Sequence, residues 1–195
     1  MDFDGAKKYV FSRMKNELSR NLHYHSIDHT KDVMSAIEKL AEMENVSEHD
    51  KELLLTGALF HDLGFVITYD GHENASINLA QEILPGYEYT EDEIKIIEGL
   101  IRATEIPQTP TNHLEKIMSD ADLDYLGRDD LFVIGQRLQY EWKLYGKVST
   151  LRDWHKAQLE FLKKHKYFTD SARKIRDKKK EENILELEKL LCYKK

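Results

Sequence analysis

The chain has 195 residues, 41% hydrophobic and 33% charged, a composition typical of a globular protein with a substantial core. Its net charge of −7 argues against binding to nucleic-acid polymers or anionic membranes, and no apolar run has the length of a membrane span. A single cysteine excludes an intrachain disulfide, so we expect a cytoplasmic protein, whose oligomeric state the composition does not determine.

Apolar residues at helical spacing predict a chain built of helices, and three prolines and nine glycines argue against an all-β fold. We expect helices at about 4–20, 28–44, 48–63, 72–84, 91–104, 113–126, 128–146, 150–165 and 169–192. Ser47 is a plausible N-cap, and Thr90 with Glu93 forms a capping box. The prediction is an all-α, compact multi-helix bundle that forms one domain over 1–195. Its functional motifs should lie within 20–130, with the helices of 128–192 packed against them.

An adjacent histidine and aspartate, His61 and Asp62, interrupt an apolar run at the predicted end of the third helix. Ionised groups are buried only when they are paired or bound to metal, and imidazole and carboxylate both ligate divalent metals. The pair therefore indicates either part of a metal site or a core histidine beside a capping aspartate. Further ligands elsewhere in the chain decide between these readings.

Two other helices carry ligand types on their apolar faces. His29 shares a face with Val33, and Asp122 lies on the inward face of its helix, whereas Asp120 and Asp124 are predicted to point to the opposite side. Three helices that direct such side chains inward favour a metal centre between core helices over three independent core polar residues. A site of imidazoles and carboxylates suits manganese, iron, cobalt, nickel, zinc or magnesium.

The segments that carry these residues, at 24–30, 61–64 and 120–127, resemble the HD-domain metal-dependent phosphohydrolase superfamily. The resemblance implies a helical fold and a divalent ion, one per chain with a second left open. The implied metal ligands are His29, His61, Asp62 and Asp122. It also implies the hydrolysis, by metal-activated water, of a small phosphorylated substrate, a nucleotide or a phosphomonoester.

Catalytic and substrate-binding roles follow from the same resemblance. The segment around His25 is similar to one in cyclic-nucleotide phosphodiesterases, where a histidine one turn before the ligand protonates the leaving oxygen. Asp62 would ligate metal and could accept a proton from water. His72 could ligate a second ion, contact substrate phosphate or simply begin a helix. Lys31 and Arg102 are the cations nearest in sequence, and His72 and Arg102 are the expected substrate contacts.

Two other functions use the same residues. A non-hydrolytic module that binds metal or a nucleotide would need a closed coordination shell, whereas catalysis needs an open position. A di-iron oxygenase would need a second full set of ligands. In the C-terminal part of the chain, Trp154, Gln158, Leu162 and His165 share one helix face, which we interpret as core.

Overall fold

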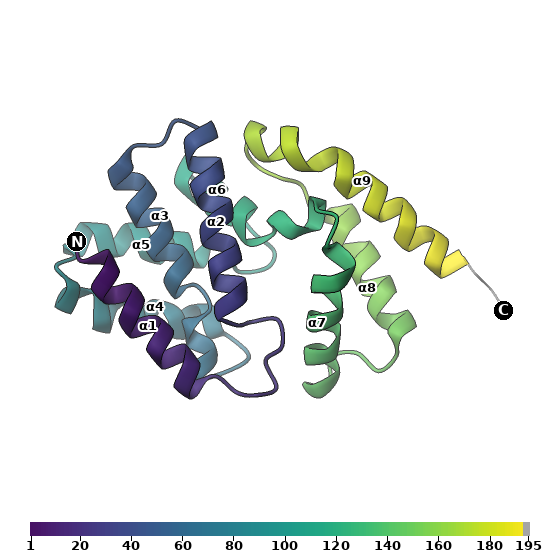
Figure 1. Ribbon diagram of the computed structural model, residues 1–195, viewed down its shortest axis with the longest axis horizontal. Coiled ribbons are helices and arrows are strands. Elements are labelled where there is room, and N and C mark those ends of the chain that lie inside the picture. The colour runs from purple at the N-terminus through teal and green to yellow at the C-terminus, as the bar shows by residue number, and fades with distance from the viewer. Residues whose placement is uncertain (193–195) are drawn as a thin grey trace.

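The computed structural model describes residues 1–192, and the regular elements in that range are all helical (Figure 1). The α-helices are α1 Phe3–Glu17, α2 Ile27–Met43, α3 Glu48–Phe60, α4 His72–Ile83, α5 Glu91–Arg102, α6 His113–Asp122, α7 Leu131–Leu144, α8 Leu151–Lys164 and α9 Asp170–Cys192. Short 3₁₀ helices follow three of them: η1 Leu63–Val66, η2 Leu84–Tyr87 and η3 Asp124–Gly127. The all-α prediction is confirmed, and so are the Ser47 cap and the capping box of Thr90 with Glu93.

The helices form two adjoining groups, α1–α6 on the left of Figure 1 and α7–α9 on the right. Apolar side chains of α1, α3, α4 and α5 form one core cluster, and those of α2, α3 and α6 form a second. A third cluster joins η3 to α7, α8 and α9 through Leu126, Leu131, Leu162 and Leu187. The segment before α2 also enters this third cluster through Tyr24, so both groups contribute to the region between them. Within the described residues, no helix is long and apolar enough to cross a membrane.

The third helix ends earlier than predicted. It stops at Phe60, so His61 and Asp62 lie in the turn between α3 and η1 and not inside a helix. Ser76 on α4 fixes this turn, because its hydroxyl donates to the carbonyl of His61 at 2.7 Å and accepts from the N–H of Gly64 at 2.8 Å. A Cβ at Gly64 would lie 2.0 Å from the carbonyl oxygen of His72, so glycine allows α4 to pack directly on the turn.

Asp120 and Asp124, which are predicted to point away from Asp122, are both buried. Asp120 accepts hydrogen bonds from the backbone N–H groups of Phe168 and Thr169 at 2.7 and 2.8 Å, just before α9 begins. Asp124 receives two hydrogen bonds from Arg176 of α9, at 2.6 and 2.7 Å. The side of α6 and η3 opposite the metal-ligand residues is therefore covered by α9 and the segment before it.

Candidate metal centre and adjoining cavity

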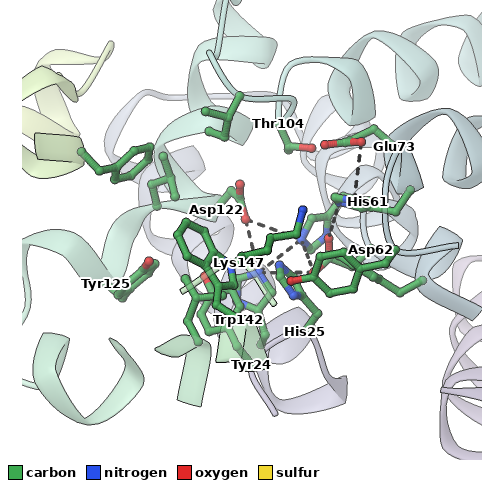
Figure 2. A pocket seen from close by; sticks show the side chains of 18 of the residues that line it. Tyr24, His25, His61, Asp62, Glu73, Thr104, Asp122, Tyr125, Trp142 and Lys147 are labelled. Atoms are coloured by element: carbon green, nitrogen blue, oxygen red, sulfur yellow. Dashed lines mark hydrogen bonds and ion pairs between the residues drawn. The ribbon is translucent and has the colours of Figure 1, made fainter. Parts of the chain in front are cut away.

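Four predicted ligands from three parts of the chain meet at one point. His29 lies in the first turn of α2, His61 and Asp62 lie in the turn after α3, and Asp122 is the last residue of α6. One ligand atom each from His29, His61 and Asp122 lies within 4.8 Å of the other two. Asp62 Oδ2 lies 3.5 Å from His29 Nε2 and 3.2 Å from His61 Nε2. Figure 2 shows His61, Asp62 and Asp122 directed toward this point.

Local hydrogen bonds orient the two imidazoles. The side chain of Ser26 caps α2 by accepting from the N–H of His29, which fixes the first turn of the helix. His61 Nδ1 lies 2.7 Å from the carbonyl oxygen of Ala58 and must donate to it, so the neutral ring carries no proton on Nε2. That nitrogen faces His29 Nε2 at 3.3 Å. Both rings thus direct a potential metal-ligating nitrogen into the space between them.

This cluster has the properties of a cation site. Asp62 Oδ2 is buried and has no hydrogen-bond partner within the described residues, a costly arrangement for an ionised oxygen unless a cation lies beside it. Burial raises the pKa of Asp122, but His29 and His61, whose Nε2 atoms lie 3.3 and 3.5 Å from its Oδ1, outweigh this effect when they are protonated and lower the pKa to about 2. Two imidazole nitrogens and two carboxylates are a suitable donor set for a divalent transition metal or magnesium. The residues present therefore fit such an ion.

The part of the sequence that contains the helices of this cluster matches a known family. Residues 26–124, just over half of the chain, match the model of the HD domain. The chain belongs to the HD-domain family. HD domains bind divalent metals, and the family is one of metal-dependent hydrolases. The family match thus agrees with the resemblance drawn from the three sequence segments.

Two other proteins are similar to this one. An uncharacterised protein of Clostridium beijerinckii is 34% identical over 93 residues, which are 46% of this chain and 59% of that protein. The crystal structure of a predicted HD superfamily hydrolase from an uncultured Thermotogales bacterium superposes with a TM-score of 0.63, at 20% identity. That superposition covers 94% of this chain and 90% of the other. At this identity the structural likeness supports the fold, including the helices that follow the matched HD segment.

The structure brings two further histidines of the HD protein to the metal centre. His72 Nε2 lies 3.4 Å from Asp62 Oδ1, the oxygen that does not face His29 and His61. Its ring stacks on Phe65 with centroids 3.9 Å apart. His25 stacks on the same ring at 4.2 Å, so Phe65 lies against both imidazoles. His25 and His72 both line the cavity described below.

Sequence reasoning missed the residue that holds His25. Glu141 of α7 has no exposed surface, and its Oε1 lies 2.5 Å from His25 Nδ1. Its Oε2 accepts the backbone N–H groups of His23, Tyr24 and His25 at 3.0, 3.0 and 3.2 Å. Tyr69 donates its hydroxyl to Oε1 at 3.1 Å. Because the carboxylate only accepts, His25 must donate from Nδ1, and its Nε2 is the nitrogen left for the cavity.

The predicted cations do not reach the site. Arg102 and Lys31 are exposed, neither lines the cavity, and the ammonium of Lys31 lies over the ring of Phe11. Lys147, in the connection between α7 and α8, lines the cavity instead. Its ammonium is 2.8 Å from Asp70 Oδ1. Proximity in the sequence therefore did not identify the lysine that lines the cavity.

A cavity of about 440 Å³ opens beside the metal centre. The four candidate ligands line one part of it, and side chains of α7 and α8 line another. Trp154, Gln158 and Leu162, which we interpreted as core, are indeed buried but form part of this wall. His165 is not a lining residue; its Nδ1 lies 3.4 Å from Lys180 Nζ.

Proposed function

We propose that this HD protein is a phosphohydrolase that cleaves a phosphate ester of a small metabolite, a nucleotide or a phosphomonoester. The observation that carries the proposal is the buried Asp62 Oδ2, which has no hydrogen-bond partner among the described residues and lies beside His29 and His61 at the edge of a cavity. Asp122 completes the set that would hold one divalent ion. Manganese, iron, cobalt, nickel, zinc and magnesium all suit these donors.

When bound, the ion supplies Lewis acidity, which makes water a better nucleophile at neutral pH and neutralises phosphoryl charge. The protein supplies the proton transfers. His25 donates a proton from Nε2 to the leaving oxygen, since Nδ1 is held by Glu141. Asp62 helps to hold the ion and can accept a proton from the attacking water. His72 lies beside the other oxygen of Asp62, where it can contact the phosphate or hold a second ion.

The cavity favours hydrolysis over the two other functions. A non-hydrolytic module that binds metal or a nucleotide would use the same four residues, but catalysis requires open space next to the ion, and about 440 Å³ is present here. A di-iron oxygenase needs a second set of ligands. Among the described residues, His72 is the histidine next to the second oxygen of Asp62. That single imidazole favours one firmly held ion.

The test combines metal analysis with hydrolysis assays. The purified protein is analysed for bound metals, stripped with a chelator and reloaded with each of the six metals. Hydrolysis of an aryl phosphate and of a panel of nucleotides is then measured. We expect about one ion per chain and turnover that returns with the metal. A protein that binds metal and hydrolyses none of these esters would favour the non-hydrolytic module.

A variant separates the metal site from general folding. Asp62→Ala should abolish metal retention while the helical circular-dichroism signal remains. Asp92→Ala is the matched control, since Asp92 is an exposed aspartate on α5 whose side chain pairs with Lys95 at 3.3 Å. Full metal occupancy in Asp62→Ala would contradict the assignment of the ligands.

A further inference from the structure

The wall of the cavity that α7 and α8 form is mainly apolar, whereas the metal centre consists of histidines and aspartates. The apolar residues of the wall are Leu138, Trp142, Trp154, Ala157, Phe161 and Leu162. Trp142 and Trp154 pack edge to face with their centroids 5.4 Å apart. A molecule that binds next to the metal centre and fills the cavity would therefore contact a large apolar and aromatic surface.

Charge excludes a chain of phosphates from this wall. The carboxylates that line the cavity are Asp62, Asp70, Glu73 and Asp122, and no arginine of the described residues is among the lining side chains. Lys147 is the lysine that lines it, and Asp70 already pairs with it. Polyphosphates are bound by several arginines, lysines or metal ions that offset their charge. A single phosphate at the metal centre is compatible with these surroundings, but further phosphates along the wall are not.

One polar group interrupts the apolar wall. Gln158 of α8 is buried and lines the cavity, opposite a position where α7 has no side chain. A Cβ at Gly135 would lie 2.5 Å from Gln158 Nε2, so the glycine makes room for the amide. An amide can both donate and accept, which suits an uncharged polar group on an otherwise apolar molecule.

We propose that the substrate is a phosphomonoester whose alcohol portion is large, uncharged and mainly apolar or aromatic. Its phosphate lies at the metal centre and its alcohol portion lies against α7 and α8. This inference rests on the proposed phosphohydrolase function. In the reaction, water oxygen forms a bond to phosphorus and gives a proton to Asp62, the bond from phosphorus to the alcohol oxygen breaks, and that oxygen takes a proton from His25. The products are inorganic phosphate and the alcohol.

The position of the wall explains why the family match alone does not predict this substrate. The metal-ligand residues lie within residues 26–124, whereas α7 and α8 follow that segment. The volume of about 440 Å³ lies in the range of cavities that hold one small organic molecule. Each methylene that moves from water to such a wall strengthens binding about fourfold.

The experiment uses n-butyl, n-hexyl and n-octyl phosphate with the metal-loaded protein. Their alcohols have nearly the same acidity, so differences in kcat/KM report contact with the wall and not chemical reactivity. We expect kcat/KM to rise at least tenfold from butyl to octyl and adenosine triphosphate to be a poorer substrate than octyl phosphate. Equal values along the series, or a preference for the triphosphate, would overturn the inference while leaving the phosphohydrolase function intact.

Binding gives a readout that does not need turnover. The chain has two tryptophans, and both line the cavity, so their fluorescence reports occupancy directly. Octylphosphonate should change it at a concentration at least tenfold lower than butylphosphonate. If no phosphate ester is hydrolysed but the longer phosphonate still binds more tightly, the recognition of an apolar group by the wall is supported and the proposed hydrolysis fails. Binding that is independent of chain length overturns the inference.

A variant assigns the effect to the wall. Phe161→Asn should reduce the octyl-to-butyl ratio of kcat/KM at least fivefold, because it places a polar amide against the alkyl chain. Val133→Asn is the control, since Val133 of α7 is 60% exposed and does not line the cavity. The ratio within one preparation does not depend on the fraction of folded protein, so partial misfolding of Phe161→Asn cannot imitate the result. An unchanged ratio would contradict the placement of the alkyl chain.

Discussion

Glu141 connects α7 to the segment that carries His25, and replacing it tests that connection. The substitution Glu141→Gln keeps the shape of the side chain and removes its charge. The carboxylate accepts five hydrogen bonds, three from backbone N–H groups through Oε2 and two, from His25 and Tyr69, through Oε1. If the amide oxygen of glutamine takes the position of Oε2, its NH₂ group faces His25 and Tyr69, and both lose their acceptor.

The expected cost follows from these two contacts. A hydrogen bond to a charged group contributes about 1.5 to 3 kcal/mol, so the loss of two in Glu141→Gln should destabilise the protein by about 3 to 6 kcal/mol. For a chain of this size the melting temperature should fall by roughly 6 to 24 °C. Glu186→Gln, an exposed glutamate on α9, makes the same change of charge and should leave the melting temperature unchanged.

The activity should change as well. With glutamine, His25 Nδ1 faces a donor, so the hydrogen bond that orients the ring is lost. A proton donor that is no longer held toward the leaving oxygen should reduce kcat by about 100-fold, the lower end of general acid–base contributions, with little change in KM. A variant with wild-type melting temperature and wild-type kcat would refute the role of Glu141.

The pH dependence of stability has a defined sign. Burial raises the pKa of Glu141. The hydrogen bond from His25, the charge interaction with His25 and the hydrogen bonds from backbone N–H groups outweigh the effect of burial, so the pKa lies below the ordinary 4.5. A carboxylate whose pKa is lowered by folding stabilises the protein fully above its unfolded pKa and loses this effect as the pH falls through the folded value. The difference in unfolding free energy between wild type and Glu141→Gln should therefore be largest near neutral pH and shrink below pH 4.5. A difference that grows toward acid would contradict this assignment.

Three further substitutions test the two sides of α6 and the turn that holds Asp62. Asp122→Ala should lose metal and keep most of its stability. Asp120→Ala should bind metal at wild-type stoichiometry but unfold about 3 kcal/mol more easily, because the buried donors of Phe168 and Thr169 lose their acceptor. Metal analysis and denaturant unfolding distinguish the two variants, and the reverse pattern would refute the assignment. Gly64→Ala should destabilise by about 3 kcal/mol, since its Cβ would lie 2.0 Å from a backbone oxygen of α4. An unchanged denaturation midpoint would show that α4 can move away without cost.

The helices, and the residues that meet at the candidate metal centre, could be predicted because both depend on local patterns. Apolar periodicity gave all nine α-helices of the described range, and the types and spacing of the histidines and aspartates indicated the ligands. The ends of the helices were less accurate. The residues around His61 continue an apolar run, yet the contact of Gly64 with α4 favours a turn there. Residues distant in the sequence fix that contact, so periodicity within one helix does not reveal it.

The contacts of Asp120, Asp124 and Glu141 could not be predicted, because their partners lie on parts of the chain that only the tertiary fold brings close. The period of α6 directs Asp120 and Asp124 away from Asp122, but it does not reveal that α9 and the segment before it cover that side. Glu141 follows Ile134 and Leu138 by seven and three positions, so a carboxylate lies on an apolar stripe. That signal was present in the sequence. Its partner His25 lies 116 positions away, and only the fold brings the two together.

These contacts bear on whether the chain acts as one domain, which stays a prediction. The backbone N–H groups of His23 and His25 and the ring of His25 all use an acceptor on α7, and Asp124 uses Arg176 on α9. A chain that ended before α7 would leave these buried and half-buried groups without partners, at a cost that a marginally stable protein cannot easily tolerate. The helices that follow the matched HD segment thus orient the proposed acid and form the wall of the cavity. If the proposed function holds, changes in α7 or α8 will alter substrate preference without altering any proposed metal ligand.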